Sequence, residues 1–412
     1  MSNSIIKKIL VAVSAVGPGL FLIGYNIGTG SVTTMAKAGA EYGMSLLWAI
    51  VLSCIFTYIL MAAYGQVTLV SGKTALLNIK SQFKWGKPLA LYIMAALITG
   101  ELLALVGIMG IVADLIQEGI RLMTNGAIVS VAWIVPVLII ALFSMFWFGQ
   151  YKIFEKVLTV FVIMMVFCFV GVFFMVSPDL ISIVKGLVPS MPDEPGAFGL
   201  VAAMAGTTCS AAVFIIRSTV VTEKGWTIEN LKDEKKDAFV SSAMMLLLSG
   251  LIMAVSAGTL HLMGLRVDNT LDLIGLFEPI GGKVASLMLI LGIAGAGLST
   301  IFPIVLIAPW LISDYMGKPR DIQSPMYRVL IILGLLVAFC AIFLEKSPTI
   351  LMVFSMAFQA AILPAVAIPV FILLNKKSFM NDHTASSRMN AGLVAVILFS
   401  LVTTYFAIKG FF

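Results

Sequence analysis

The chain has 412 residues, of which 60% are hydrophobic and 11% are charged, and its mean hydropathy is +1.09. A soluble domain cannot hide so large an apolar fraction, because the surface that it presents to water is largely polar. The net charge of +6 would suit a nucleic acid only if basic residues were interleaved with aromatics on a polar face, and no such segment is present. These properties exclude a soluble enzyme and predict a protein embedded in the lipid bilayer.

Apolar runs of about twenty residues recur along the chain, each long enough to cross a hydrocarbon layer of about 30 Å. Hydropathy, read together with glycine, proline and charged residues, divides them into about eleven transmembrane helices. We therefore expect an all-α polytopic membrane protein with a single transmembrane domain over residues 1–412. The expected spans are 9–37, 46–70, 88–117, 127–148, 153–176, 198–222, 238–264, 281–313, 327–344, 349–373 and 390–410.

Basic residues predict the orientation of these spans. Lys7 and Lys8 precede the first span, and every second connection after it is rich in lysine or arginine. Because positively charged loops stay in the cytoplasm, the N-terminus is expected inside the cell and Phe412 outside. The expected location is the cytoplasmic (inner) membrane, and the charge of +6 is a topology signal.

The first span is interrupted near its middle by GYNIGTGSVTT, residues 24–34. Glycine costs about 1 kcal/mol relative to alanine inside a helix, and nearby hydroxyl and amide groups can satisfy backbone groups that leave the helix. Non-helical backbone inside a membrane is tolerated only where it is buried in protein or lines a polar cavity. We therefore expect a broken helix whose second half begins near Ser31 and points its positive end at the break.

A second interruption lies in AAMAGTTCSAAVFIIRSTVV, residues 202–221, whose centre at Gly206–Ser210 is again small and rich in hydroxyls. A packing kink would explain one such segment, because glycines also let membrane helices approach closely. Two of them at corresponding positions predict a transporter with inverted repeats and a substrate site at the membrane midplane. The repeats would be residues 9–176 and 198–373, followed by an extra helix at 390–410.

Several motifs resemble those of the Nramp divalent-metal transporters, and the resemblance covers nearly the whole chain. The motifs are GPGLFLIGYNIGTGSVTTMAKAGAEYGMSLLW at the first span, then VSGKTALL, FGQYKIFEKV and GAGLST. The resemblance implies a leucine-transporter-type fold that works by alternating access, with helices one and six broken and substrate bound between the breaks. It also implies a secondary-active transporter and not an enzyme, and we expect no cofactor other than a coupling proton.

The metal ligands of the family do not carry over to this chain. Its Asp-Pro-Gly-Asn motif falls on Gly28–Ser31, and its Met-Pro-His motif falls on Ser210–Ala212. A later family histidine falls on Arg217, and the acidic residue of the family's proton pathway falls near Glu101. The resemblance and the breaks together predict these substrate-binding residues: Asn26, Gly28, Thr29, Gly30, Ser31, Thr207, Thr208, Cys209, Ser210, Met356 and Gln359.

These residues offer hydroxyl, carbonyl, amide and thiol groups, but neither break contains a carboxylate, which a divalent cation usually requires. Arg217 lies seven residues after Ser210, about 10 Å along a helix, and an unpaired positive charge there would repel a dication. Free N–H groups at the half-helix N-termini suit an anion instead. The sequence therefore favours a small polar solute that carries a carboxylate.

Glu101 and Arg217 are the candidate coupling residues. An arginine inside a span costs several kcal/mol unless it is paired or hydrated, so it marks a functional candidate. Arg217 either pairs with Glu101 or Glu155 or extends to the cytoplasmic vestibule, and a protonatable Glu101 would couple transport to protons. The charged segment at residues 222–239 is interpreted as a helical cytoplasmic linker with a solvated face, and a gate element is the alternative.

Three functions stay open. The preferred one is transport of a small carboxylate-bearing solute, and the alternative is transport of Mg²⁺ or Mn²⁺ held largely hydrated by neutral oxygens. A non-transporting sensor or scaffold is the third. The expected partners are the substrate and the lipid bilayer, with no nucleic acid. No phosphate-binding loop, cysteine–histidine metal cluster or catalytic triad is present in the sequence.

Overall fold

The computed structural model describes residues 28–124, 126–148, 163, 166–167, 169–176, 179–193, 196–277, 282–318, 320–344 and 348–411. All regular structure in these ranges is helical, as the composition predicts. Nine helical segments within them are long and apolar enough to cross a membrane. The first half of the first expected span and most of the fifth, including Glu155, lie outside the described residues.

The helices follow one another along the chain, with short helices in the connections. The longer ones are α3 (Thr29–Tyr42), α4 (Leu47–Ser71), α6 (Gly86–Met123), α7 (Val131–Phe148), α10 (Ala197–Thr208), α11 (Ala211–Glu223), α12 (Leu231–Gly258), α13 (Gly282–Met316), α14 (Pro325–Phe339), α15 (Pro348–Asn375) and α17 (Ser387–Phe411). The shorter ones are α5 (Ala75–Gln82), α9 (Leu180–Lys185), α16 (Lys377–Met380) and the 3-10 helices η1 (Ile228–Asn230), η2 (Thr270–Phe277), η3 (Cys340–Phe343) and η4 (Asn381–His383).

Local sequence explains where several helices begin and end. Gly72 follows α4 in the left-handed conformation, with φ of 62°, and its N–H donates to the Thr68 carbonyl at 2.8 Å. Glycine adopts this conformation without the steric cost that a side chain brings, so it ends the helix. α14 begins at Pro325 after Ser324, whose hydroxyl accepts from the Tyr327 N–H. Serine before a proline at the first helical position is a common helix start.

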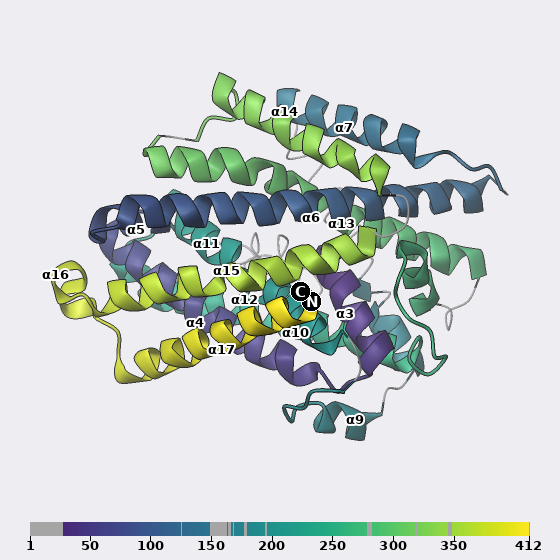
Figure 1. Cartoon of the computed structure of the whole chain (residues 1–412), viewed down its shortest axis with the longest axis horizontal. Coiled ribbons are helices and arrows are strands. Elements are labelled where there is room, and N and C mark those ends of the chain that lie inside the picture. Colours follow the sequence, from purple (N-terminus) through teal and green to yellow (C-terminus); the bar gives the residue numbers. More distant parts are fainter. Residues whose placement is uncertain are drawn as a thin grey trace, which may run out of the picture.

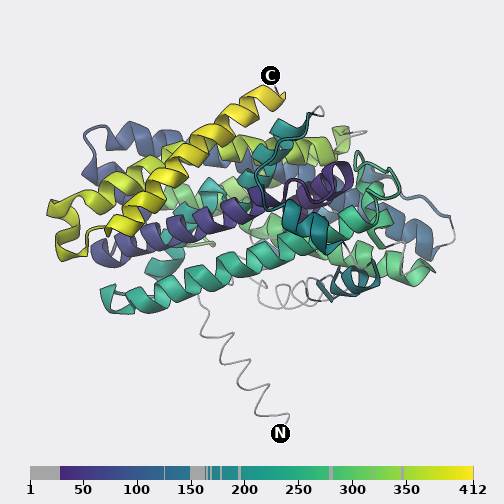
Figure 2. The same ribbon diagram turned by 90° about the horizontal axis from the view of Figure 1, so that it is seen from below.

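The long helices pack side by side in one bundle (Figure 1). α6 packs against both α13 and α15, and α15 also packs against α10 and α17. α7 and α14 lie together along one edge of the molecule (Figure 1). In the perpendicular view, α12 and α17 lie on either side of α4 (Figure 2). Other helices surround α10 and α3. An interrupted helix is tolerated in a membrane only when it is buried in this way or lines a polar cavity.

The sixth span is broken where the sequence predicts it. α10 ends at Thr208 and α11 begins at Ala211, while Cys209 and Ser210 between them leave the helical conformation. α3 begins at Thr29, after Gly28 in extended conformation, slightly earlier than the expected start near Ser31. The described part of the first span is therefore the second half-helix, and its N-terminus lies at the expected break.

Two glycines allow these half-helices to pack closely on their neighbours. A Cβ atom on Gly206 of α10 would lie 1.7 Å from the backbone oxygen of Met356 in α15. A Cβ atom on Gly39 of α3 would lie 2.4 Å from the backbone oxygen of Met253 in α12. Small residues let membrane helices approach until their backbones touch. These two contacts fix the positions of the half-helices that carry the candidate site.

Candidate substrate site

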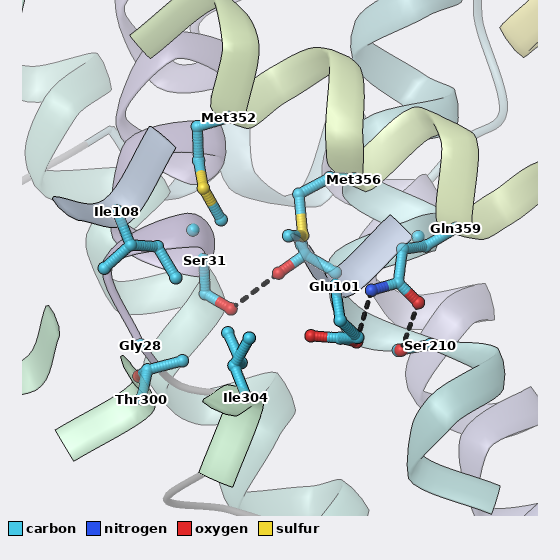
Figure 3. Close-up of a pocket in the computed structure, with 13 residues that line it drawn as sticks. Gly28, Ser31, Glu101, Ile108, Ser210, Thr300, Ile304, Met352, Met356 and Gln359 are labelled. Carbon is cyan, nitrogen blue, oxygen red and sulfur yellow. Dashed lines mark hydrogen bonds between the residues drawn. The ribbon is translucent and has the colours of Figure 1, made fainter. Parts of the chain in front are cut away.

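A small cavity lies where the N-terminus of α3 meets the break between α10 and α11 (Figure 3). Residues of α6, α13 and α15 also line it. Its volume is about 30 Å³. A cavity needs a volume of about 10–15 Å³ on this scale to hold one water molecule. In this conformation the cavity therefore has room for an ion or one to two waters.

Most of the residues predicted for substrate binding line this cavity. The two breaks supply backbone and hydroxyl groups, and α15 supplies an amide and a thioether. The predicted residues found there are Gly28, Gly30, Ser31, Thr207, Ser210, Met356 and Gln359, together with Glu101.

A hydrogen bond joins the two breaks directly. The hydroxyl oxygens of Ser31 and Thr207 lie 2.8 Å apart, and both residues are buried (Figure 3). Ser31 is in the first turn of α3, and Thr207 is in the last turn of α10. The positive end of one half-helix thus meets the negative end of the other, which places backbone N–H and C=O groups of opposite polarity at the same cavity.

A second hydrogen-bonded chain connects three other helices at the cavity. Ser210 donates from Oγ to Gln359 Oε1 at 3.0 Å, and Gln359 donates from Nε2 to Glu101 Oε1 (Figure 3). Glu101 is only 2% exposed, and it lies on α6 rather than on either broken helix. Neither break contains a carboxylate, as the sequence predicts, but the neighbouring helix α6 places one in the space between the breaks.

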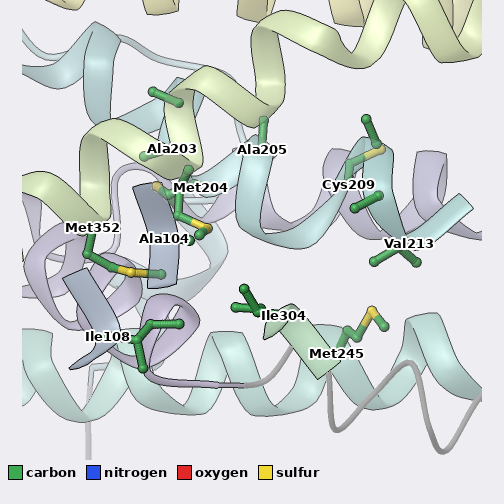
Figure 4. Packing of buried hydrophobic residues seen from close by; sticks show 14 of the residues in the cluster. Ala104, Ile108, Ala203, Met204, Ala205, Cys209, Val213, Met245, Ile304 and Met352 are labelled. Carbon is green, nitrogen blue, oxygen red and sulfur yellow. The ribbon is translucent and has the colours of Figure 1, made fainter. Parts of the chain in front are cut away.

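Three predicted site residues of the breaks face elsewhere. Thr29 is buried and points its hydroxyl toward the carbonyl of Ile293 in α13, at 3.5 Å. The Thr208 carbonyl accepts a hydrogen bond from Thr57 of α4 at 3.0 Å. Cys209 is buried in the apolar cluster near Val213 (Figure 4). None of the three lines the cavity, and Asn26 lies outside the described residues.

Arg217 does not reach the cavity and instead forms a buried ion cluster with α12. Its Nη2 atom lies 2.9 Å from Glu234 Oε1, and its Nη1 atom donates to Asp237 Oδ2. The exposed fractions of Arg217, Glu234 and Asp237 are 0%, 0% and 3%. The expected pairing of Arg217 with Glu101 is therefore wrong. The two carboxylates balance the positive charge of Arg217, so the cavity does not face an uncompensated guanidinium.

These carboxylates belong to a segment that was expected to be solvated. α12 begins at Leu231 rather than near residue 238, so Glu234 and Asp237 lie within the bundle. A Cβ atom on Gly65 of α4 would lie 2.0 Å from Glu234 Oε1, so α4 is close enough to shield the carboxylate. The interpretation of residues 222–239 as a solvated linker is therefore wrong for these two positions.

Five further residues line the cavity without having been predicted for the site. They contribute a hydroxyl, a thioether and apolar surface: Ile108, Gly206, Thr300, Ile304 and Met352. Gly206 and Thr300 fall in motifs that the sequence does single out, at the second break and in GAGLST. Met352 lies one helical turn before Met356 and two turns before Gln359. This spacing puts all three on one face of α15 and could have identified Met352.

Comparison with known proteins assigns the chain to a family. The family model described as natural resistance-associated macrophage protein-like, Nramp, matches residues 19–408. The chain belongs to the Nramp family. A divalent metal cation transporter of Erwinia tasmaniensis is 24% identical over 388 residues, which cover 92% of this chain and 90% of that protein. The identification from the sequence motifs is therefore confirmed.

Solved structures show the same fold. A manganese transporter of Eremococcus coleocola superposes on this Nramp protein with a TM-score of 0.72 and 16% identity, covering 96% of this chain and 87% of the other. The transporter MhsT, in complex with L-phenylalanine, superposes with a TM-score of 0.63 and 13% identity, covering 96% and 98%. The leucine-transporter-type fold is confirmed, and this Nramp protein is an integral membrane transporter rather than an enzyme.

Proposed function

We propose that this Nramp protein transports a divalent metal cation by alternating access through the cavity between its two breaks. The observation that carries the proposal is the position of the Glu101 carboxylate on the cavity wall, beside Ser210 and Gln359. Carboxylate, hydroxyl and amide oxygens together form the type of ligand set that divalent cations use in proteins. The alternative function considered from the sequence is therefore preferred to the carboxylate-bearing solute.

The charge of Arg217 no longer opposes a cation. Only an unpaired guanidinium near the site would repel a divalent cation. Its two ion-pair partners in α12, Glu234 and Asp237, bring the cluster to a formal charge that is not positive. A cation in the cavity would then meet one carboxylate on the wall and no uncompensated arginine from α11. The charge of Arg217 therefore does not favour an anionic substrate over a cation.

The size of the cavity also supports a small ion. Its volume of about 30 Å³ suits a cation that has lost most of its water, or a cation with one bound water. An amino acid would need several times this space. The relative from Erwinia tasmaniensis is named as a divalent metal cation transporter, which supports the same substrate class.

The small-solute function keeps one supporting observation. The N-termini of α3 and α11 both lie at the cavity wall, where their N–H groups would favour an anion. Glu101 on the same wall would repel a carboxylate, so we rank this function second. We further propose that Glu101 exchanges a proton when the cation binds, because a ligating carboxylate has to be deprotonated. The N-terminus is proposed to face the cytoplasm, as the basic residues predict.

A ligand screen on purified full-length protein tests the proposal. Thermal unfolding would be followed with Mn²⁺, Cd²⁺ or Mg²⁺, and in parallel with amino and organic acids, because a ligand that binds the folded state raises the midpoint. Stabilisation by a metal, together with uptake of that metal into proteoliposomes, is the expected result. Stabilisation by an organic acid and by none of the metals would support the small solute instead.

A further inference from the structure

We propose that the short helix α5 and Arg320 form a gate between the cavity and the cytoplasm, by connecting the end of α11 to the end of α13. The inference rests on the proposed function only because it takes the cavity between the breaks as the substrate site. No residue of α5 lines that cavity, and α5 packs against both α11 and α13. α5 and α11 lie close together near one end of the bundle (Figure 1).

Two helices lead from the cavity to this end of the bundle. α11 begins after Ser210 on the cavity wall and ends at Glu223, about 20 Å along its axis. α13 contributes Ile304 to the wall and reaches Asp314, about 15 Å further along. A substrate that moves between these two helices has to pass their ends, so contacts that connect the ends close this path.

α5 connects the two helices through buried hydrogen bonds at its N-terminus. The hydroxyl of Thr74, the residue before the helix, donates to Asp314 Oδ1 in α13. The backbone N–H of Ala75 donates to Ser218 Oγ in α11 at 2.8 Å. Thr74, Asp314 and Ser218 are all buried. Separation of α11 from α13 at this level breaks at least one of these hydrogen bonds.

Two further contacts reinforce the connection. Arg320 follows α13, and its Nη1 atom lies 3.0 Å from Glu223 Oε1 at the end of α11. The same guanidinium lies 4.8 Å from the centre of the Trp310 ring in α13. In the last turn of α5, Lys80 donates from Nζ to the carbonyl of Tyr315 at 2.7 Å. Because the Glu223 side chain is 54% exposed, its ion pair contributes less than the buried hydrogen bonds.

The buried carboxylate of Asp314 keeps the closed gate from being too stable to open. Its second oxygen, Oδ2, has no hydrogen-bond partner among the residues that the structure describes. A buried polar atom without a partner costs free energy, and the cost is larger for a charged group. Opening would let water reach Oδ2, which offsets part of the loss of the Thr74 hydrogen bond. The contacts thus allow both a closed and an open state, as alternating access requires.

Packing of a connection between helices is the competing explanation, because α5 also packs against α6. Under that explanation, loss of the Thr74 hydroxyl changes stability alone, without opening the cavity to one side of the membrane. Thr74→Val removes the hydroxyl and keeps the shape of the side chain. Thr222→Val is the matched control, because the Thr222 hydroxyl donates to the Ser218 carbonyl within α11 and connects no two helices.

Cysteine accessibility in the cavity tests the gate. In full-length protein that carries Ile304→Cys, the rate of reaction with a membrane-impermeant methanethiosulfonate reagent would be measured in inside-out and right-side-out vesicles. Peptide mass spectrometry identifies modification at position 304 and separates it from modification of the native cysteines. Added Thr74→Val should speed the reaction from the cytoplasmic side by about fivefold or more. Added Thr222→Val should change neither rate.

Arg320→Gln tests the same gate with a second variant, which the exposed pair with Glu223 makes easy for the fold to tolerate. It should speed the reaction from the cytoplasmic side by about twofold or more. Arg328→Gln is its control, because Arg328 packs on a different helix, 4.0 Å from the centre of the Trp147 ring in α7. The reaction rate should be unchanged in this control.

The outcomes separate this inference from the proposed function, because accessibility is measured without substrate. Unchanged rates in both Thr74→Val and Arg320→Gln would overturn the gate, even in a protein that transports metal. Equal acceleration from both sides of the membrane would also overturn it, because it would show a general loosening of the bundle. If the gate variants behave as expected and no metal is taken up, the gate stands and the proposed function fails.

Discussion

Gln359 of α15 donates a hydrogen bond from Nε2 to the carboxylate of Glu101 in α6, inside the cavity between the two breaks. The same glutamine accepts a hydrogen bond from Ser210, the residue that separates α10 from α11. A carboxylate on an unbroken helix is thereby linked to the interruption of a broken one. The proposed binding of a cation at Glu101 would therefore act on the break through two hydrogen bonds.

Glu101→Gln should strongly weaken metal binding while the protein stays folded. The neutral amide can still accept the hydrogen bond from Gln359, but it removes the negative charge that offsets dehydration of the cation. We expect the affinity for Mn²⁺ or Cd²⁺ to fall by at least about tenfold, measured by calorimetry, with little change in the unfolding midpoint.

Glu118→Gln is the matched control for this variant. Glu118 lies on the same helix and pairs with Arg121 at 2.7 Å, away from the cavity wall. Metal affinity should be unchanged in Glu118→Gln. Metal binding of wild-type strength in Glu101→Gln would remove the observation on which the proposed function depends.

Gly206→Ala should destabilise the protein itself. The new methyl group would lie 1.7 Å from the backbone oxygen of Met356, and a backbone atom cannot rotate away. Overpacking of this kind costs about 1–3 kcal/mol, so we expect a clearly lower unfolding midpoint in detergent. In Gly334→Ala, the added Cβ atom would lie 3.8 Å from its nearest neighbour, which is an ordinary van der Waals distance. The unfolding midpoint of this variant should be unchanged or higher. Equal midpoints for the two variants would mean that α10 and α15 can separate freely.

Gly30→Leu should stop transport without unfolding the protein. A side chain at this position meets the mobile end of Met352 rather than backbone, so the structure can adjust. The side chain would nevertheless occupy the space of about 30 Å³ that the substrate needs. We expect no uptake into proteoliposomes, together with a monodisperse elution profile. Uptake at the wild-type rate would place the substrate elsewhere.

Arg217→Met should be strongly destabilising, because it leaves Glu234 and Asp237 buried without their counter-ion. Removing one partner of a buried ion pair typically costs about 3–5 kcal/mol. Arg121→Met is the comparison and should cost less, since Arg121 is half-exposed and pairs with a single carboxylate, that of the buried Glu118. Thermal unfolding measures both. The triple variant Arg217→Met/Glu234→Gln/Asp237→Asn should recover part of the loss.

Glu101 and Arg217 should behave as independent sites. They contact different partners, Gln359 in one case and α12 carboxylates in the other. Changes at residues without shared partners usually add within about 0.5 kcal/mol. The unfolding midpoint of the Glu101→Gln/Arg217→Met variant should therefore drop by the sum of the two single effects. A smaller drop would restore the idea of a coupled pair.

Local chemistry made the break at Cys209–Ser210 predictable, because glycine is costly inside a helix and nearby hydroxyl groups can satisfy the backbone groups that a break frees. The partners of Glu101 were harder to predict. α6 is apolar over most of its length, so periodicity does not say which of its faces meets the breaks. Met352 was missed because methionine also serves as packing. Its position on the cavity wall is evident only once α15 is placed beside Gly30, a residue more than 300 positions away in the sequence.

The partners of Arg217 were missed for a different reason. Glu234 and Asp237 lie in a run of lysines and acids that any hydropathy scale assigns to water. Their burial depends on the close approach of α4, where Gly65 leaves room for the Glu234 carboxylate. The sequence shows a run of charged residues, but it does not show that a tertiary contact with α4 excludes water from Glu234 and Asp237.

The close contact of Gly206 with α15 has a mechanical consequence. It leaves α10 no freedom to slide along α15, while the Arg217 cluster fastens α11 to α12. The two halves of the sixth span therefore differ in their closest attachments, α10 to the backbone of α15 and α11 to two carboxylates of α12, with Cys209 and Ser210 between them. Any change in the backbone angles of these two residues would have to stretch one of the two attachments.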